Sequence, residues 1–179
     1  PMRVYLAGFM GSGKSTVGPL VADALGVDFV DLDAIVEDRA GQSIPAIFAE
    51  QGEAAFRQLE TDALHATADC PDAVVALGGG TIVNDANRRF AQSTGLLIYL
   101  KVSADVIVGR VAEGAAHRPL LQDDTGTPLP IDRMRARIDR MLHARRPAYE
   151  ATPVTIDANR PPDAVARAIV EAVQANRQA

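Results

Sequence analysis

Residues 8–15 combine glycines, a lysine and a serine in the spacing G-x-x-x-x-G-K-[ST]. Gly8, Gly11 and Gly13 let the backbone adopt conformations that other residues disfavour, so that successive N–H groups point at phosphate oxygens. In such loops the lysine, here Lys14, reaches the β- and γ-phosphates, and the hydroxyl of Ser15 binds Mg²⁺. The spacing therefore predicts a loop that binds a nucleoside triphosphate. The expected nucleotide contacts in it are Gly11, Ser12, Gly13, Lys14, Ser15 and Thr16.

Two carboxylates follow the apolar run that ends at residue 30, and they are the candidates for a second magnesium anchor. Asp31 and Asp33 are two residues apart, and such residues share a face of an extended chain. Asp31 is predicted to hold Mg²⁺, through water, because this ion keeps much of its hydration shell. Asp33 is then free to accept the proton of an acceptor hydroxyl. The alternative is that one or both aspartates cap the next helix.

Three consecutive glycines, Gly78, Gly79 and Gly80, follow a later apolar run. Such a run of glycines is typical of a place where another part of the backbone or a ligand approaches closely. We therefore expect it to face the transferred phosphate or the acceptor.

Arg57, Arg118 and Arg145 each flank apolar residues instead of lying in charged runs. Two guanidinium groups that converge can bind one carboxylate with paired hydrogen bonds, which favours an anionic acceptor. Taken singly, each of the three is better explained as a surface arginine.

The chain alternates between apolar runs and segments of helical period, which predicts an α/β fold with a parallel sheet. Ligands on such sheets bind at the carboxyl ends of the strands. The predicted strands are Arg3–Ala7, Asp28–Asp31, Ala73–Leu77, Gly95–Val102 and Pro153–Ile156. The predicted helices are Lys14–Leu25, Asp33–Ala40, Ser43–Ala49, Glu53–Ala68, Ala86–Gln92, Ala104–Ala112, Asp132–Arg146 and Pro162–Ala175.

Residues 113–130 interrupt this alternation with two glycines, three prolines and little periodicity. A loop this long in a compact domain is often functional. Beside a phosphoryl-transfer site we expect it to be a lid that excludes water, with a plain surface insertion as the alternative.

Composition limits the remaining possibilities. The 179 residues fit a single domain, and the net charge of −5 disfavours a general nucleic-acid or membrane-surface binder. The single cysteine, Cys70, excludes an intramolecular disulfide. No apolar run reaches the length of a membrane span, so we expect a cytoplasmic protein. His65, His117 and His143 show no ligand spacing and are assigned no role.

From Val4 to about Ile169 the chain resembles the shikimate kinases, which use ATP to phosphorylate a hydroxyl of shikimate. The phosphate loop alone is common to many families, whereas the ordered combination of motifs is much more specific. These motifs are Gly8–Thr16, Asp31–Asp33, Ser43-Ile44 with Ile47-Phe48, Gly52-Glu53 with Phe56-Arg57 and Glu60, Gly78–Gly80, Arg118–Leu121, and Arg145 with Pro147 and Tyr149.

The resemblance implies a three-layer α/β/α fold with a five-stranded parallel sheet, like that of nucleoside monophosphate kinases. It implies one kinase domain over residues 1–179, with acceptor-binding helices at about 33–62 and a lid at about 113–130. The reaction would give shikimate 3-phosphate and ADP, with ATP and Mg²⁺ as cofactors. A monomer with no nucleic-acid or membrane partner is expected.

The resemblance also implies roles for single residues. Asp33 would contact the acceptor hydroxyls, and Arg57 and Arg145 its carboxylate, with the backbone of the glycine run alongside. Arg118 would reach the transferring phosphate, and Lys14 would be the fixed counter-charge. Arg110 and Pro162 would enclose the adenine.

One departure concerns the lid. The interval from Arg118 to Arg145 is longer than the family commonly shows, and Asp123 to Ile131 resembles an insertion.

Two alternatives to the assignment as a shikimate kinase stay open. One is another small-molecule kinase on the same scaffold, such as a gluconate kinase. The other is a nucleotide-binding regulatory module, although the chain lacks the N-K-x-D motif typical of guanine switches.

Overall fold

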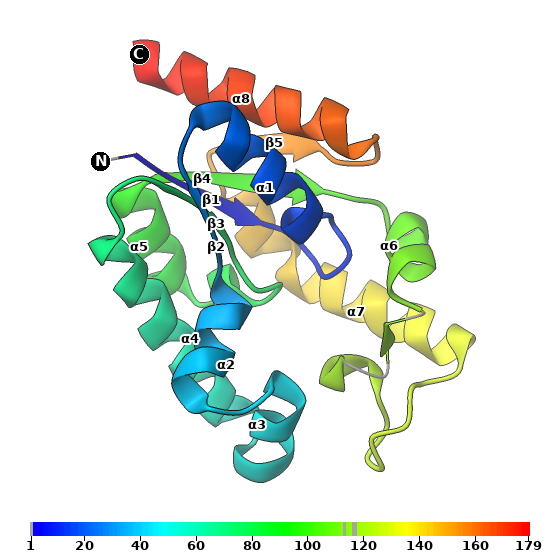
Figure 1. Ribbon diagram of the computed structural model, residues 1–179. Coiled ribbons are helices and arrows are strands. Elements are labelled where there is room, and N and C mark those ends of the chain that lie inside the picture. Colours follow the sequence, from blue (N-terminus) through cyan, green and yellow to red (C-terminus); the bar gives the residue numbers. More distant parts are fainter. Residues whose placement is uncertain (1, 113, 116–117) are drawn as a thin grey trace.

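A computed structural model describes residues 2–112, 114–115 and 118–179 of the chain. Within these residues five parallel strands form one sheet in the order β2-β3-β1-β4-β5 (Figure 1). This confirms the predicted α/β class and the five-stranded sheet. The strands are β1 (Arg3–Ala7), β2 (Asp28–Asp31), β3 (Ala73–Ala76), β4 (Leu96–Lys101) and β5 (Val154–Asp157).

Helices cover both faces of the sheet, as parallel strands require. Figure 1 shows α1 and α8 over one face and α5 and α7 over the other. The helices are α1 (Lys14–Leu25), α2 (Leu32–Ala40), α3 (Ile44–Gln51), α4 (Glu53–Ala66), α5 (Asp85–Thr94), α6 (Ala104–Val111), α7 (Ile131–Glu150) and α8 (Pro162–Gln178). The central strands β1 and β3 are buried along their whole length because they pack against helices on both sides.

The segments that carry the predicted site all follow the carboxyl ends of strands. The phosphate loop joins β1 to α1, and α2 follows β2 directly. The glycine run follows β3, and α6 and the predicted lid follow β4. Because parallel strands end at the same edge, these segments meet there.

Helix α7 differs from its prediction in a way that matters for the site. It continues through Pro147 to Glu150, whereas the sequence predicted an end at Arg146. A proline inside a helix removes one backbone hydrogen bond and normally ends it. Here the turn beyond the proline buries Ala148 and Tyr149, and this burial offsets the loss.

The described part of the predicted lid is ordered by its own contacts. A 3-10 turn at Pro119–Leu121 places Leu121 in the core. Residues 123–127 then form a hairpin in which Asp123 N donates to Thr127 O at 2.9 Å and Gly126 N donates to Asp123 O at 3.0 Å.

The lid returns to the body of the protein at Leu129, whose N–H donates to Leu121 O at 2.9 Å. Arg137 of α7 donates to the carbonyls of Leu120 at 3.2 Å and Gln122 at 2.9 Å. Residues 113 and 116–117 of the predicted lid lie outside the described residues. The limits of the lid and of the acceptor-binding helices therefore stay predictions.

Across the described ranges, none of the helices is both long and apolar enough to cross a membrane.

Candidate active site

Two adjoining cavities lie at the carboxyl edge of the sheet. The phosphate cavity has a volume of about 300 Å³ and is lined by the phosphate loop and Asp31. The acceptor cavity has a volume of about 530 Å³ and is lined by residues of α2, α3, α4, α7 and the lid. The residues that line both are Met10, Asp33, Gly78, Gly79 and Arg118. Groups bound in the two cavities would therefore be neighbours.

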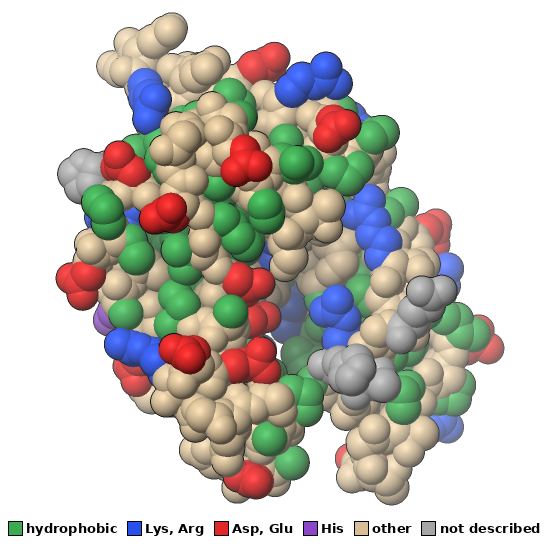
Figure 2. All heavy atoms as spheres, viewed as in Figure 1, with side chains coloured by type: hydrophobic (Ala, Val, Ile, Leu, Met, Phe, Trp, Pro, Cys, Tyr) green, Lys and Arg blue, Asp and Glu red, His purple; other side chains and the backbone are tan. Residues whose placement is uncertain are grey.

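The cavities open into a cleft that the space-filling view shows between two parts of the surface (Figure 2). Acidic side chains gather on one wall of this cleft, and lysine and arginine side chains lie on the facing wall. The cleft can therefore place a cationic wall against a phosphate while a carboxylate faces the acceptor.

The phosphate loop has the backbone that the glycine spacing predicts. Gly11 and Gly13 have φ of 77° and 99°, a region that side chains disfavour. A methyl group on Gly11 would lie 2.7 Å from Val111 Cγ1, so a larger residue is also sterically excluded. Arg110 supports the loop from α6, because its Nη1 donates to Gly11 O at 2.9 Å.

Lys14 lies in the phosphate cavity and donates to the carbonyls of Gly8 and Phe9, the latter at 3.1 Å. Burial lowers the pKa of Lys14 to about 8, and the nearby Asp33 carboxylate opposes that shift. Phosphate oxygens would favour the charged form and raise the pKa again. Ser15 and Thr16 line the same cavity, whereas Ser12 does not.

Asp31 and Ser15 both line the phosphate cavity. Asp31 caps α2, because its Oδ1 accepts from Asp33 N at 3.0 Å. The alternative that one of the two aspartates caps the helix is therefore correct for Asp31, whereas Asp33 lies in the first turn of α2 and not at the cap.

The described residues contain no cluster of three or more His, Cys, Asp or Glu that could hold a metal. A hydroxyl and a carboxylate nevertheless fit Mg²⁺, since this ion takes most of its ligands from water and phosphate.

Asp33 stands at the boundary between the cavities. Burial raises its pKa to about 6, and the negative charges of Asp31 and Glu60 act in the same direction, while Lys14 opposes them. A carboxylate whose pKa is near 6 is a stronger base than an ordinary aspartate and is still ionised at neutral pH. The sequence predicted that Asp33 accepts the proton of the acceptor hydroxyl, and its position between the two cavities is compatible with that role.

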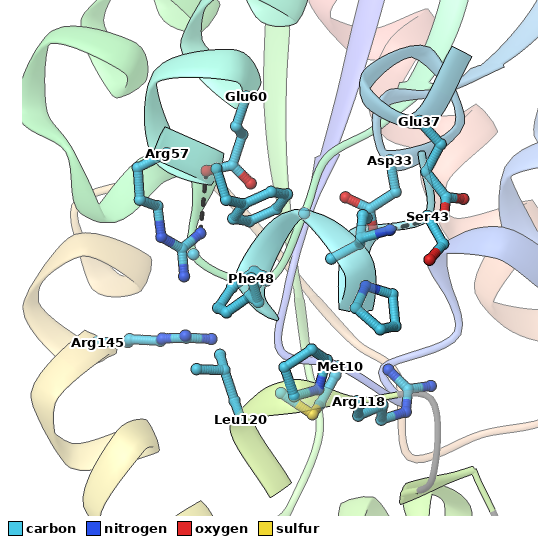
Figure 3. A pocket seen from close by; sticks show the side chains of 17 residues that line it. Met10, Asp33, Glu37, Ser43, Phe48, Arg57, Glu60, Arg118, Leu120 and Arg145 are labelled. Carbon is cyan, nitrogen blue, oxygen red and sulfur yellow. Dashed lines mark hydrogen bonds and ion pairs between the residues drawn. The ribbon is translucent and has the colours of Figure 1, made fainter. Parts of the chain in front are cut away.

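Arg57 and Arg145 come from different helices, α4 and α7, and line the acceptor cavity together. Figure 3 shows both on one side of the cavity, with Asp33 and Glu37 on the other. Arg57 donates to Glu60 Oε1 at 3.0 Å and to Glu53 Oε1 at 3.4 Å. The arginines that the sequence grouped are thus brought together.

The two arginines differ in their pairing. Arg145 is 8% exposed, and its Nη1 is buried without a hydrogen-bond partner among the described residues. Its guanidinium carbon lies 5.2 Å from the centre of the Phe9 ring. An unpaired buried guanidinium nitrogen is a strong donor for a ligand carboxylate.

The glycine run is required by close packing and not by unusual dihedral angles. A methyl group on Gly80 would lie 2.7 Å from Arg57 Nη1, and one on Gly79 would lie 3.1 Å from Arg145 Nη1. On Gly78 it would lie 2.5 Å from Glu60 Oε2. The sequence predicted that a backbone segment or a ligand comes close here. The nearest groups are instead mostly side chains of the acceptor cavity, with the backbone N of Met10 at 3.3 Å from the added methyl group at Gly79.

Arg118 lines both cavities, and its neighbours Pro119 and Leu120 line the acceptor cavity. Burial lowers the pKa of Arg118 and Asp33 raises it. The structure does not bring Pro162 to this place, because that residue begins α8, is exposed and does not line the phosphate cavity. Its contact with adenine stays a prediction.

Two further residues of the site were quoted in motifs but given no role. Glu60 is buried, holds Arg57 and accepts from Thr81 Oγ1 at 3.0 Å. The sequence pattern that could have revealed Glu60 is a carboxylate on the buried face of α4, four residues after Phe56. Tyr149 donates from its hydroxyl to Gly79 O. Because the sequence predicted that α7 ends at Arg146, it did not place Tyr149 one helical turn after Arg145 on the same helix.

The fold and the paired cavities define a P-loop kinase that phosphorylates a small acceptor. A family model described as Shikimate kinase matches residues 10–174. The chain is 57% identical over 178 residues to a shikimate kinase of Salinibacter ruber, with 99% of the chain and 87% of the relative covered. The chain belongs to the shikimate kinase family, and this membership implies use of ATP.

Solved structures of shikimate kinases have the same fold as this chain. A shikimate kinase from Acinetobacter baumannii in complex with shikimate has a TM-score of 0.87 and 33% identity, with 98% of this chain and 94% of that chain covered. A gluconokinase from Sinorhizobium meliloti has a TM-score of 0.63 at 20% identity and covers 97% and 92%. That second likeness shows the fold alone, so the gluconate alternative is not favoured.

Proposed function

We propose that this chain transfers the γ-phosphate of ATP to the 3-hydroxyl of shikimate, giving shikimate 3-phosphate and ADP. The observation that carries this proposal is the shared boundary of the two cavities, where Asp33 and Arg118 line both. Phosphoryl transfer needs little covalent chemistry from a protein beyond positioning and charge stabilisation, and this boundary offers both.

The acceptor cavity supports a small hydroxylated carboxylate. Arg57 and Arg145 would hold its carboxylate, since guanidinium groups match carboxylate geometry with paired hydrogen bonds. Asp33 lies on the facing side, so it would accept hydrogen bonds from the hydroxyls and take the proton of the attacking one. The backbone of Gly78, Gly79 and Gly80 would lie alongside.

The phosphate cavity supports the donor. Lys14 and the amides of the loop from Gly11 to Thr16 would bind the phosphates, and Arg118 would neutralise charge that develops on the transferred group. Arg110 and Pro162 would contact the adenine. Mg²⁺, held by Ser15 and through water by Asp31, would supply positive charge on the phosphate oxygens.

We also propose that the protein is a cytoplasmic monomer without a nucleic-acid or membrane partner. The net charge of −5 supports the last point, because polyanions repel such a surface. Sedimentation at micromolar concentration would test the monomer.

The test of the function is steady-state ADP release with Mg·ATP and one of three acceptors: shikimate, gluconate or a nucleoside monophosphate. Only shikimate is expected to raise the rate well above the ATPase background. Comparable stimulation by gluconate, or no stimulation by any acceptor, would refute the proposal.

Asp33→Asn then tests the role of the carboxylate. This change should lower kcat about 10²-fold or more, the usual contribution of a positioned base, and leave the KM for ATP nearly unchanged. Asp38→Asn on the exposed side of the same helix is the matched control. An unchanged kcat in Asp33→Asn would remove the residue from the catalytic group.

A further inference from the structure

Tyr149 occupies the turn of α7 that extends past Pro147. It lies one helical turn after Arg145, is 1% exposed, and donates from its hydroxyl to Gly79 O. Gly79 lines both the phosphate and the acceptor cavities. A buried side chain that lines neither ligand cavity therefore holds the carbonyl of a residue that lines both.

The ring of Tyr149 is itself fixed from the sheet. It stacks on Tyr99 of β4 with ring centres 4.7 Å apart and an angle of 14° between the planes. Such a stack restricts the ring to one orientation, so the hydroxyl points to a defined place. Burial raises the pKa of Tyr149, against the opposing effect of the nearby Arg145 guanidinium, so its hydroxyl keeps the proton that it donates.

The held carbonyl determines the direction of an amide. The C=O of Gly79 and the N–H of Gly80 belong to one planar peptide unit and point in opposite directions. Among the described residues, the N–H groups of Gly79 and Gly80 donate no hydrogen bond. Glycine dihedrals are soft, so without an anchor this peptide could rotate and turn its amide away.

We propose that Tyr149 is a positioning residue for the acceptor. By holding Gly79 O, it directs the free N–H of Gly80 away from α7 toward the acceptor, beside Arg57. Arg145 and Tyr149, one turn apart, would thus act on the same ligand, the first through its guanidinium group and the second through the backbone. This inference rests on the proposed function and adds a residue that touches neither ligand.

The test compares two changes that each remove one hydroxyl from the stacked pair. Tyr149→Phe keeps the ring but loses the bond to Gly79 O. Tyr99→Phe is the matched control, because the Tyr99 hydroxyl makes no hydrogen bond among the described residues. We expect Tyr149→Phe to raise the KM for shikimate about 10-fold, in line with a single lost buried hydrogen bond. Its KM for ATP should stay within twofold, as should both constants of Tyr99→Phe.

A second measurement separates positioning from loss of fold. Saturating shikimate raises the Tm of any variant that binds it, by mass action. At one fixed shikimate concentration this increase should be smaller in Tyr149→Phe than in wild type or Tyr99→Phe, whatever the starting Tm. An equal increase in all three proteins would overturn the inference, as would parallel rises in the KM for both substrates. A wild-type chain that shikimate does not stimulate would instead refute the proposed function.

Discussion

The phosphate cavity and the acceptor cavity share five residues but are built in different ways. The phosphate cavity takes six of its fourteen lining residues from one continuous loop, between Met10 and Thr16, and the others from β2, α2, β3, the glycine run, α6 and Arg118. The acceptor cavity depends on side chains from α2, α3, α4, α7 and the lid, which are far apart in the sequence. The difference shows that the phosphate loop itself is a local property of the chain, whereas the rest of the phosphate cavity and the whole acceptor cavity depend on tertiary packing.

Lys14 in the phosphate cavity and Arg57 in the acceptor cavity differ in how their charges are balanced. Among the described residues Lys14 has only carbonyl oxygens as hydrogen-bond partners, and its pKa is lowered, so phosphate oxygens would supply the negative charge that it lacks. Arg57, in contrast, is already paired with Glu60. Its orientation is therefore fixed before the acceptor arrives, which lowers the entropic cost of binding.

The largest effect is expected at the shared boundary. Arg118→Ala should lower kcat about 10³-fold, in the range of other arginines that stabilise a transferring phosphoryl group. ATP affinity should change little, because the loop and Lys14 remain. Rapid-quench and steady-state assays would measure both. Arg140→Ala, at an exposed position of α7, is the control, and a turnover within tenfold of wild type would place Arg118 outside the reaction.

A pair of glycine changes should separate the two cavities. Gly80→Ala pushes the Arg57 guanidinium aside and should raise the KM for shikimate about 10- to 100-fold, the effect of a lost charged hydrogen bond. Gly11→Ala strains the loop at φ 77° and should raise the KM for ATP by a similar factor. Gly109→Ala, in open space on α6, should change neither. If both site variants raised both constants equally, the cavities would not be separable.

The pH dependence of the rate should differ between the substrates. The kcat/KM for shikimate should fall about tenfold from pH 7 to pH 5, because Asp33, with a pKa of about 6, must be ionised to accept a proton. The kcat/KM for ATP should fall above pH 8 as Lys14 loses its proton. Initial rates over pH 5–9 would measure both, and a flat profile for shikimate below pH 7 would contradict the role of Asp33.

The smallest effect concerns stability. The pKa of Asp33 is raised in the folded protein, so the folded state binds its proton more tightly, and stability falls as pH rises from about 4 to 6. Asp33→Asn removes this penalty and should stabilise the fold by roughly 1–3 kcal/mol at pH 7. Urea unfolding would measure it, and the gain should vanish near pH 3. Destabilisation at pH 7 would show that the carboxylate has a structural role.

The sequence was sufficient for the strands, which the structure places within a residue or two of prediction, because buried β-branched runs are locally distinctive. It was not sufficient for the end of α7. A proline breaks an isolated helix, and here the burial of Ala148 and of Tyr149, which stacks on Tyr99, compensates for it. That compensation is a tertiary contact and leaves no local signal.

In the candidate site, too, some features have a local sequence signal and others depend on tertiary contacts. The phosphate loop is predicted from spacing alone, since glycine conformations and the lysine position are encoded within eight residues. The convergence of Arg57 and Arg145 depends on how α4 and α7 pack. The sequence grouped these arginines with Arg118, but it named them as the carboxylate-binding pair only through family resemblance. The role of Glu60 follows from its contacts, which no spacing rule supplies.

The hairpin at residues 123–127 has a consequence for how this family can change over time. Its hydrogen bonds begin and end within the hairpin, while Leu121, Leu129 and Arg137 fasten its base. Residues added or removed at its tip therefore leave Arg118 and the acceptor cavity in place. We therefore expect that this loop can be lengthened or shortened without loss of the reaction, and that its tip is a suitable place to insert a peptide tag.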